Sequence, residues 1–159
     1  MKSAYFNLSV TKYLEVLSSR TPVPGGGSAA AMTGALGSAL LLMAARYSQN
    51  RNASSQAERR IAKIIREGEA IKQRFIELID LDAQAYQEVV ASRHSPLAAR
   101  RKALRQAKKI PQEVCRLSYK AVTLAPYLVQ DGNKNLLSDV EAAVELLMAA
   151  YNTAHIFTK

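Results

Sequence analysis

The sequence predicts an all-α protein: a helical bundle of about five helices, two of them long, around a buried central helix rich in alanine and glycine. The main observation is periodicity, because apolar residues recur three and four positions apart along most of the chain, as on one face of an α-helix. In addition, no segment alternates apolar and polar residues at period two, the pattern of a half-buried strand. The 159 residues suit one domain, and we expect residues 1–159 to form it.

The first expected helix runs from Ser9 to Ser19. Ser9 can cap it, because a side-chain oxygen at this position accepts a free N–H of the first turn. The apolar face consists of Val10, Tyr13, Leu14 and Leu17. Pro22 and Pro24 follow and argue against helix in the connector, since proline has no N–H to donate.

The central helix follows a glycine turn and is expected to run from Ser28 to about Ser48. The turn, Gly25 to Gly27, allows the backbone to bend sharply and to approach another group closely. Ser28 has the side chain of a helix N-cap. The residues that follow carry no charge before Arg46, and the first of them are small. Because small residues let another backbone come close, we expect neighbours on most sides of this helix.

Two other interpretations of this stretch remain open. A run of about 20 apolar residues can cross a bilayer, and small residues four apart also occur in membrane helices. A glycine turn before a helix can also bind an anion at the free N–H groups of the helix N-terminus. However, GGGS is neither GxGxxG nor GxxxxGK followed by Ser or Thr, and no strand precedes it. We favour a tight turn into a closely packed core helix, outside any membrane.

Two long helical patterns come next, after a polar break at residues 49–55. Apolar residues keep helical spacing from about Ser54 to Arg93, where Gly68 is the one glycine. A second pattern runs from Pro96 to about Leu128, with a kink expected at Pro111 and with Pro126 near its end.

A turn of sequence QDGNKN follows, and Ser138 and Asp139 stand near the start of a further helix. The apolar stripe of this helix consists of Leu136, Val140, Val144, Leu147, Met148 and Tyr151. The sequence ends at Lys159 soon after this stripe, so one alternative is that the domain lacks a C-terminal helix.

Composition narrows the class of protein. The net charge of +9 favours an anionic partner, but the cations are spread out and aromatic residues make up only 6%, which argues against a stacking platform for nucleic-acid bases. A single cysteine, Cys115, indicates no disulfide framework. His94 and His155 lie far apart in the sequence, so we expect no metal. The N-terminus shows no apolar signal segment, and we expect a cytoplasmic protein.

Candidate chemistry centres on acidic residues among apolar ones. Asp80 and Asp82 lie in LIDLDAQAY, inside a predicted helix, where aspartate is unfavourable. Asp82 shares a face with Leu78 and Tyr86, so it is the one expected to point into a cleft; the alternative is a solvated or salt-bridged aspartate. Asp139 is a second candidate, although the helix dipole also favours an acid in a first turn. Tyr86 suits either the core or a ligand.

Three segments, TPVPGGGSAAAMTGALGSAL, LIDLDAQAY and GNKNLLSD, together resemble the formiminotransferase-cyclodeaminase and methenyltetrahydrofolate cyclohydrolase family. They occur in the family's order and at comparable separations, and the resemblance covers roughly Leu8 to Asn152. It implies an all-helical homodimer that acts on one-carbon forms of tetrahydrofolate, with no metal or redox cofactor.

The resemblance also implies roles for particular residues. The second aspartate of the D-x-D segment is the family's proton-transfer residue, which is Asp82 here. The remaining candidates are expected to bind the substrate: Pro24, Gly25, Gly26, Gly27, Ser28, Tyr86, Asn135, Ser138 and Asp139.

Two activities occur in the family. One hydrolyses 5,10-methenyltetrahydrofolate to 10-formyltetrahydrofolate, and the other cyclises 5-formiminotetrahydrofolate with release of ammonia. We expect the hydrolase, because no formiminotransferase sequence accompanies this domain. A carboxylate suits the cationic methenyl bridge and can move a proton to or from it, and Arg or Lys suits the anionic glutamate tail. The alternatives are the cyclodeaminase and a non-catalytic helical folate-binding or assembly module; a nucleic-acid binder is disfavoured.

Overall fold

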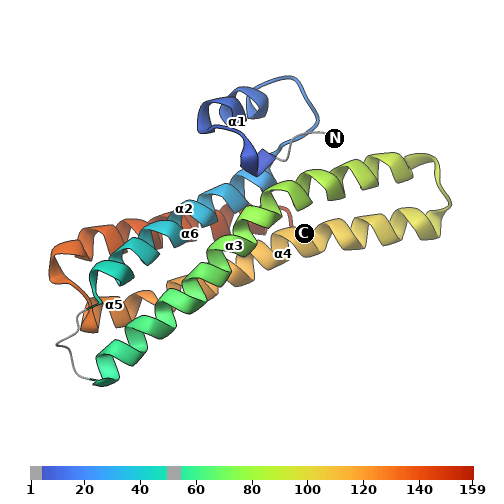
Figure 1. The fold of residues 1–159 in the computed structure, drawn as a ribbon. Helices are drawn as coiled ribbons and strands as arrows, with labels where there is room; N and C mark the ends of the chain where they lie inside the picture. The colour runs from blue at the N-terminus through green and yellow to red at the C-terminus, as the bar shows by residue number, and fades with distance from the viewer. Residues whose placement is uncertain (1–4, 50–54) are drawn as a thin grey trace.

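The computed structural model describes residues 5–49 and 55–159, and in these ranges it contains helices and no strand (Figure 1). The α-helices are α1 (Val10–Leu17), α2 (Gly26–Tyr47), α3 (Ser55–Ala91), α4 (Leu97–Val122), α5 (Ala125–Asp131) and α6 (Leu137–Ile156). Short 3-10 turns η1 (Tyr5–Asn7), η2 (Ser92–His94) and η3 (Lys134–Leu136) stand before α1, α4 and α6. The predicted all-α fold is confirmed, with one more α-helix in the described ranges than expected.

The additional helix arises because the stretch from Pro96 to about Leu128, which was predicted to be one kinked helix, forms two helices. Instead, α4 continues through Pro111 and ends at Val122, and α5 begins at Ala125 with Pro126 in its first turn. A proline fits there because a first-turn N–H has no partner inside the helix. At the other long helix, the expected start at Ser54 lies outside the described residues.

The N-cap predicted for α1 is confirmed, since Oγ of Ser9 accepts a hydrogen bond from the backbone N–H of Lys12 at 3.2 Å. This cap and the predicted apolar residue Tyr13, which is buried, fix α1 as a short helix lying against the bundle. In Figure 1, α1 lies above the N-terminal end of α2, on the outside of the long helices.

Helix α2 is the centre of the bundle, as predicted, and packs along both α3 and α6. Its small residues bring these neighbours close: a Cβ on Gly34 would lie 2.5 Å from the ring of Phe75, and one on Gly37 would lie 2.9 Å from Leu147. Among the described helices, α2 alone is long and apolar enough to cross a bilayer. However, 61% of its apolar window is buried inside the bundle, which is what the core helix of a soluble protein shows.

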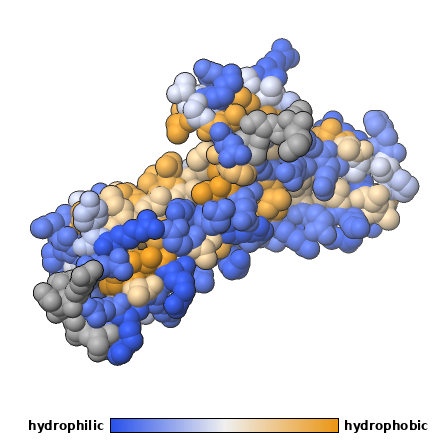
Figure 2. All heavy atoms as spheres, in the orientation of Figure 1, coloured by the Kyte–Doolittle hydropathy of each residue, from blue (hydrophilic) through white to orange (hydrophobic). Residues whose placement is uncertain are grey.

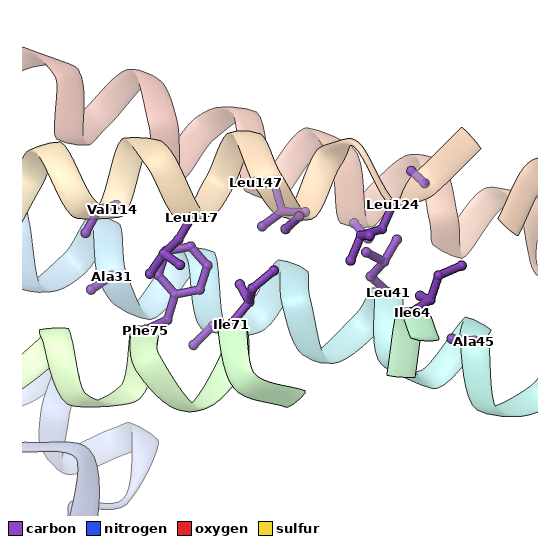
Figure 3. Close-up of a cluster of buried hydrophobic side chains, with 14 of the residues drawn as sticks. Ala31, Leu41, Ala45, Ile64, Ile71, Phe75, Val114, Leu117, Leu124 and Leu147 are labelled. Carbon is purple, nitrogen blue, oxygen red and sulfur yellow. The ribbon is translucent and has the colours of Figure 1, made fainter. Parts of the chain in front are cut away.

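The core lies where α2, α3, α4 and α6 meet. Phe75 of α3 is fully buried, and Figure 3 shows its ring in the space between α2 and α4, beside Leu117. Burial of such a side chain contributes roughly 1.5–3 kcal/mol to folding. Helices α3 and α4 are also joined at the surface by Arg74, whose Nε and Nη2 each donate to a carboxylate oxygen of Glu113 at 2.9 Å.

Beyond the core, α3 and α4 continue together as an exposed hairpin, which forms the right-hand end of Figure 1. We call residues 85–109 the basic hairpin, because seven Lys and Arg residues stand there against one acid, Glu88. The seven are Arg93, Arg100, Arg101, Lys102, Arg105, Lys108 and Lys109. In the part of the chain that the structure describes, none of them forms an ion pair.

Candidate active site

The N-terminus of α2 is capped by a residue of another helix. The prediction that Ser28 is the N-cap is wrong, because α2 begins at Gly26 and its N-cap is Gly25, which makes no side-chain bond. Instead, the backbone N–H of Ser28 donates to Oδ2 of Asp82 at 2.9 Å. The carboxylate of α3 thus satisfies a first-turn N–H of α2, a role that usually falls to a neighbour in sequence.

The glycine turn makes room for this contact. A Cβ on Gly27 would lie 2.0 Å from Oδ1 of Asp82, so any larger residue there would displace the carboxylate. A Cβ on Gly26 would lie 2.5 Å from the ring of Phe157, which follows α6. Gly25 has nothing within 4 Å of a built Cβ. Two of the three glycines are therefore required by side chains from other helices.

The side chain of Ser28 faces the protein interior. It is fully buried, and its Oγ lies 3.0 Å from the hydroxyl of Tyr13, which is also buried. Because each hydroxyl is the partner of the other, this pair fixes α1 against the first turn of α2. Ser28 therefore meets Asp82 through its backbone and not through its hydroxyl group.

The neighbouring aspartate has a different role. Oδ1 of Asp80 accepts a hydrogen bond from the backbone N–H of Tyr5 at 2.6 Å. Asp80 thus holds η1 against α3. The two carboxylates point in different directions, as their spacing in the helix requires.

A cavity of about 440 Å³ opens beside Asp82, between the start of α2, the C-terminal part of α3, the first half of α4 and the residue after α6. The glycine turn Gly25 to Gly27 forms one wall and Asp82 and Tyr86 of α3 another. Lys108 of α4 and Phe157 complete it. The volume lies within the range of small-molecule sites, and the lining is mostly apolar with a few polar groups, which is typical of such sites.

The structure brings some of the predicted site residues together and separates others. The glycine turn, Asp82 and Tyr86 line one cavity. Pro24 is buried next to it but does not line it.

Asn135, Ser138 and Asp139 lie elsewhere in the single chain. They stand at the start of α6, near the end of α2, where the backbone N–H of Asn133 donates to Oγ of Ser48 at 2.8 Å. Because α6 has 20 residues, its two ends are about 30 Å apart, and the cavity is at the opposite end. Within one chain these residues do not reach the cavity.

Sequence reasoning missed the cavity residues of α4 and of the segment after α6. Lys108 is one of the dispersed cations of the sequence, and Leu104 and Phe157 belong to none of its motifs. No local signal identifies them, because tertiary packing alone brings residues 104, 108 and 157 to Asp82.

The electrostatics of the cavity suit proton transfer. Burial raises the pKa of Asp82 above its ordinary value, and the hydrogen bond from Ser28 partly opposes this by favouring the charged form. Burial also raises the pKa of Tyr13. Among residues 5–49 and 55–159, no three His, Cys, Asp or Glu side chains gather as metal ligands. That the protein works without a metal stays a prediction.

Residues 9–159 match the family model described as formiminotransferase-cyclodeaminase. The chain belongs to this family. Among its relatives, the methenyltetrahydrofolate cyclohydrolase of Methylorubrum extorquens is 28% identical over 158 residues, which cover 93% of this chain and 76% of the relative. The formimidoyltransferase-cyclodeaminase of Rattus norvegicus is 25% identical over 156 residues, or 92% of this chain and only 29% of the relative.

A solved structure agrees with the family assignment. The formiminotetrahydrofolate cyclodeaminase of Thermotoga maritima superposes with a TM-score of 0.91 at 26% identity, over 96% of this chain and 77% of that one. The predicted family and the fold that it implied are thus confirmed. Members of this family process one-carbon folates, and this chain carries the same helical domain.

Proposed function

We propose that the protein hydrolyses 5,10-methenyltetrahydrofolate to 10-formyltetrahydrofolate, with Asp82 as the acid and base. The observation that carries the proposal is the half-buried carboxylate of Asp82, held at the start of α2 and lining a cavity of suitable size. The match to a methenyltetrahydrofolate cyclohydrolase over 93% of the chain supports the choice of reaction.

The proposed chemistry uses one carboxylate twice. The methenyl carbon joins N5 and N10 as a cationic amidinium, so a neighbouring carboxylate stabilises its charge. Asp82 accepts a proton as water attacks this carbon, and a neutral tetrahedral adduct forms. The bond from the carbon to N5 then breaks with its electron pair going to N5, which takes the proton back from Asp82. The hydroxyl group of the adduct loses its proton to water as its C=O bond forms, so the carbon remains on N10 as a formyl group and one proton is released overall. A raised pKa helps the return step, because the protonated carboxyl is then a populated donor.

A second candidate is the cyclodeaminase reaction. The rat relative and the Thermotoga maritima structure are both cyclodeaminases, which favours this alternative. The same site would serve it: Asp82 would protonate the departing nitrogen of 5-formiminotetrahydrofolate as ammonia leaves and the ring closes. The two reactions differ in substrate and in the release of ammonia, so assays separate them.

The first test follows the absorbance of methenyltetrahydrofolate with the purified protein and with Asp82→Asn. We expect rapid loss with the natural sequence and a rate lowered by roughly 10²–10⁴ in the variant, the usual contribution of a general acid or base. Ammonia release from 5-formiminotetrahydrofolate is measured beside it. Turnover only in the second assay would replace the hydrolase with the deaminase. No turnover in either, with folate still bound, would leave a non-catalytic binding module.

We also propose a homodimer formed by the exposed face of α2 and α6. This face carries Leu36, Tyr47 and Ile156, which are 56%, 70% and 65% exposed. In Figure 2 the surface over α2 is largely tan and orange, while the lower edge of the molecule is mostly blue. In a chain of net charge +9, an uncharged face suits a second copy because it avoids repulsion between like charges. Two helices about 30 Å long offer roughly 600 Å² per copy, near the lower bound of a specific interface.

A dimer of this kind would bring the residues at the start of α6 close to the cavity of the other copy. If the twofold axis passes through the interface perpendicular to the helix axes, α6 of one copy runs antiparallel to α6 of the other. The segment from Asn135 to Asp139 of the partner subunit then comes near this copy's cavity. Sedimentation tests the face: Leu36→Glu is expected to give monomers, and Leu97→Glu, on an equally exposed hairpin leucine, to leave the dimer intact. A monomeric natural protein contradicts the proposal.

The remaining expectations are also proposals: a cytoplasmic protein with no cofactor besides the folate substrate and no nucleic-acid or membrane partner. Full activity after dialysis against a strong chelator would support the cofactor-free reaction.

A further inference from the structure

The cavity has an aromatic ring at one end. Phe157 lies against Gly26, and a side chain on that glycine would overlap the ring at 2.5 Å. Phe157 is 45% exposed although it lines the cavity. A ring left open to water contributes little to folding, whereas it offers a flat surface on which another ring can stack. The packing of Gly26 thus maintains an aromatic surface at the bundle end.

At the end of the cavity away from Phe157, the lining continues along the basic hairpin. Tyr86 and Val89 follow Asp82 at four and seven residues, so they form one row on a single face of α3. Arg93 lies beyond the end of this row, in the turn η2 that follows α3. Tyr86 and Val89 both line the cavity, which therefore extends from Asp82 toward the tip of the hairpin.

A matching row lies on α4. Leu104 lines the cavity and is 41% exposed, and Arg100 and Arg101 precede it by one helical turn. These arginines and Arg93 form no ion pair with any residue in the described ranges. The cavity lining near Asp82 is mostly apolar, with Lys108 as its cation, and the three arginines follow beyond the lining, toward the tip of the hairpin. Guanidinium groups pair well with carboxylates, because two N–H groups match two oxygens.

We propose that the substrate lies in one fixed direction, with its bicyclic pterin ring on Phe157, its reactive carbon at Asp82, and its glutamate carboxylates at Arg93, Arg100 and Arg101. This inference rests on the proposed function and extends it to the orientation of the ligand. The benzoyl group then passes between Tyr86 and Leu104. The reverse orientation would place the carboxylates near the negative charge of Asp82, where Lys108 is the one cation among the lining residues, and away from the three arginines.

The test measures the two halves of the ligand separately by calorimetry: 6-methyltetrahydropterin for the head and p-aminobenzoylglutamate for the tail. Phe157→Ala is expected to weaken binding of the head up to about tenfold, the size of one aromatic pair, and to leave the tail within about twofold. Arg100→Gln with Arg101→Gln is expected to weaken the tail by about tenfold and to leave the head unchanged.

The matched control is Lys102→Gln with Lys109→Gln, which removes the same charge from the outer face of the same helix. It is expected to leave both fragments within about twofold, since screening limits charges beyond the Debye length. If the arginine double variant and the lysine double variant weaken binding of the tail equally, the overall positive charge of the hairpin and not a specific contact attracts it, and the proposal is overturned. Circular dichroism melting confirms that each variant is folded.

Neither fragment reacts, so these outcomes do not depend on turnover. An exchanged pattern, with Phe157→Ala weakening the tail and the arginine variant the head, would reverse the orientation and contradict the proposal while the cyclohydrolase stands. Specific effects without any turnover would support the orientation and refute the reaction. If the natural protein binds neither fragment nor intact 5-formyltetrahydrofolate, both fail.

Discussion

Gly27 and Asp82 are in contact across the junction of α2 and α3: a Cβ on the glycine would lie 2.0 Å from Oδ1 of the carboxylate. The absence of a side chain at one position therefore determines where the proposed acid and base stands. This relationship connects the glycine turn and the D-x-D segment, which are far apart in sequence and act as one site.

Gly27→Ala is expected to displace the carboxylate and to lower kcat by more than about tenfold, because a small shift of a reacting group has a large effect on rate. Overpacking should also lower the free energy of unfolding by about 1–3 kcal/mol. Gly25→Ala is the control for stability, since a Cβ there meets nothing within 4 Å and its φ of −133° suits any residue. Steady-state kinetics of Gly27→Ala and urea unfolding of both variants check this; equal changes in the free energy of unfolding would contradict it.

Asp82→Asn should abolish most activity without lowering stability at neutral pH. The raised pKa means that the folded protein holds the proton of Asp82 more tightly than the unfolded chain does. Its favourable contribution is therefore complete below the ordinary pKa of 3.8 and is lost as the pH rises through the raised value. The amide oxygen of an asparagine can still accept the N–H of Ser28. We expect the variant to melt at or above the natural Tm at pH 7 and to lose this advantage near pH 3, in melts at matched ionic strength.

The same pKa governs activity on the acid side. As the pH falls through the raised pKa of Asp82, the carboxylate becomes protonated and can no longer take a proton from water. We expect kcat/KM for the proposed hydrolysis to fall with a slope of one in this range. Asp80→Asn, which alters a carboxylate outside the cavity, should keep the same acid limb. Loss of the limb in that variant would show that the titration does not belong to Asp82.

Tyr13→Phe removes one member of the buried hydroxyl pair and leaves Oγ of Ser28 without its partner. An unsatisfied buried hydroxyl costs about 1–3 kcal/mol, so the Tm should fall by several degrees. Tyr119→Phe, on a residue that is 68% exposed, is the control and should change stability by less than about 0.5 kcal/mol. A similar small effect at Tyr13 would mean that this pair does not hold α1.

The fold was largely predictable because its signals are local. Periodicity located the long helices, and Ser9 was recognisable as a cap from its own position. The break between α4 and α5 was not predicted, although Pro126 marks its place: a proline disrupts the helix at the carbonyl four residues earlier, which is Val122, where α4 ends.

The site was predictable only where residues carried a recognisable motif. The glycine turn, Asp82 and Tyr86 were found in this way, and they share one cavity. Ser28 was misread as a cap because the real partner of its N–H stands 54 residues away. Phe157 and Lys108 resemble many other surface residues in sequence, and their place in the cavity comes from tertiary structure alone.

The length of α3 has a mechanical consequence. Its 37 residues form one helix about 55 Å long, clamped by the core over its first part and free beyond it in the hairpin. Asp82 stands near the point where the helix leaves the core. One continuous helix therefore fixes the distance from this carboxylate to the outer end of the hairpin, so a ligand that contacts both must match this length.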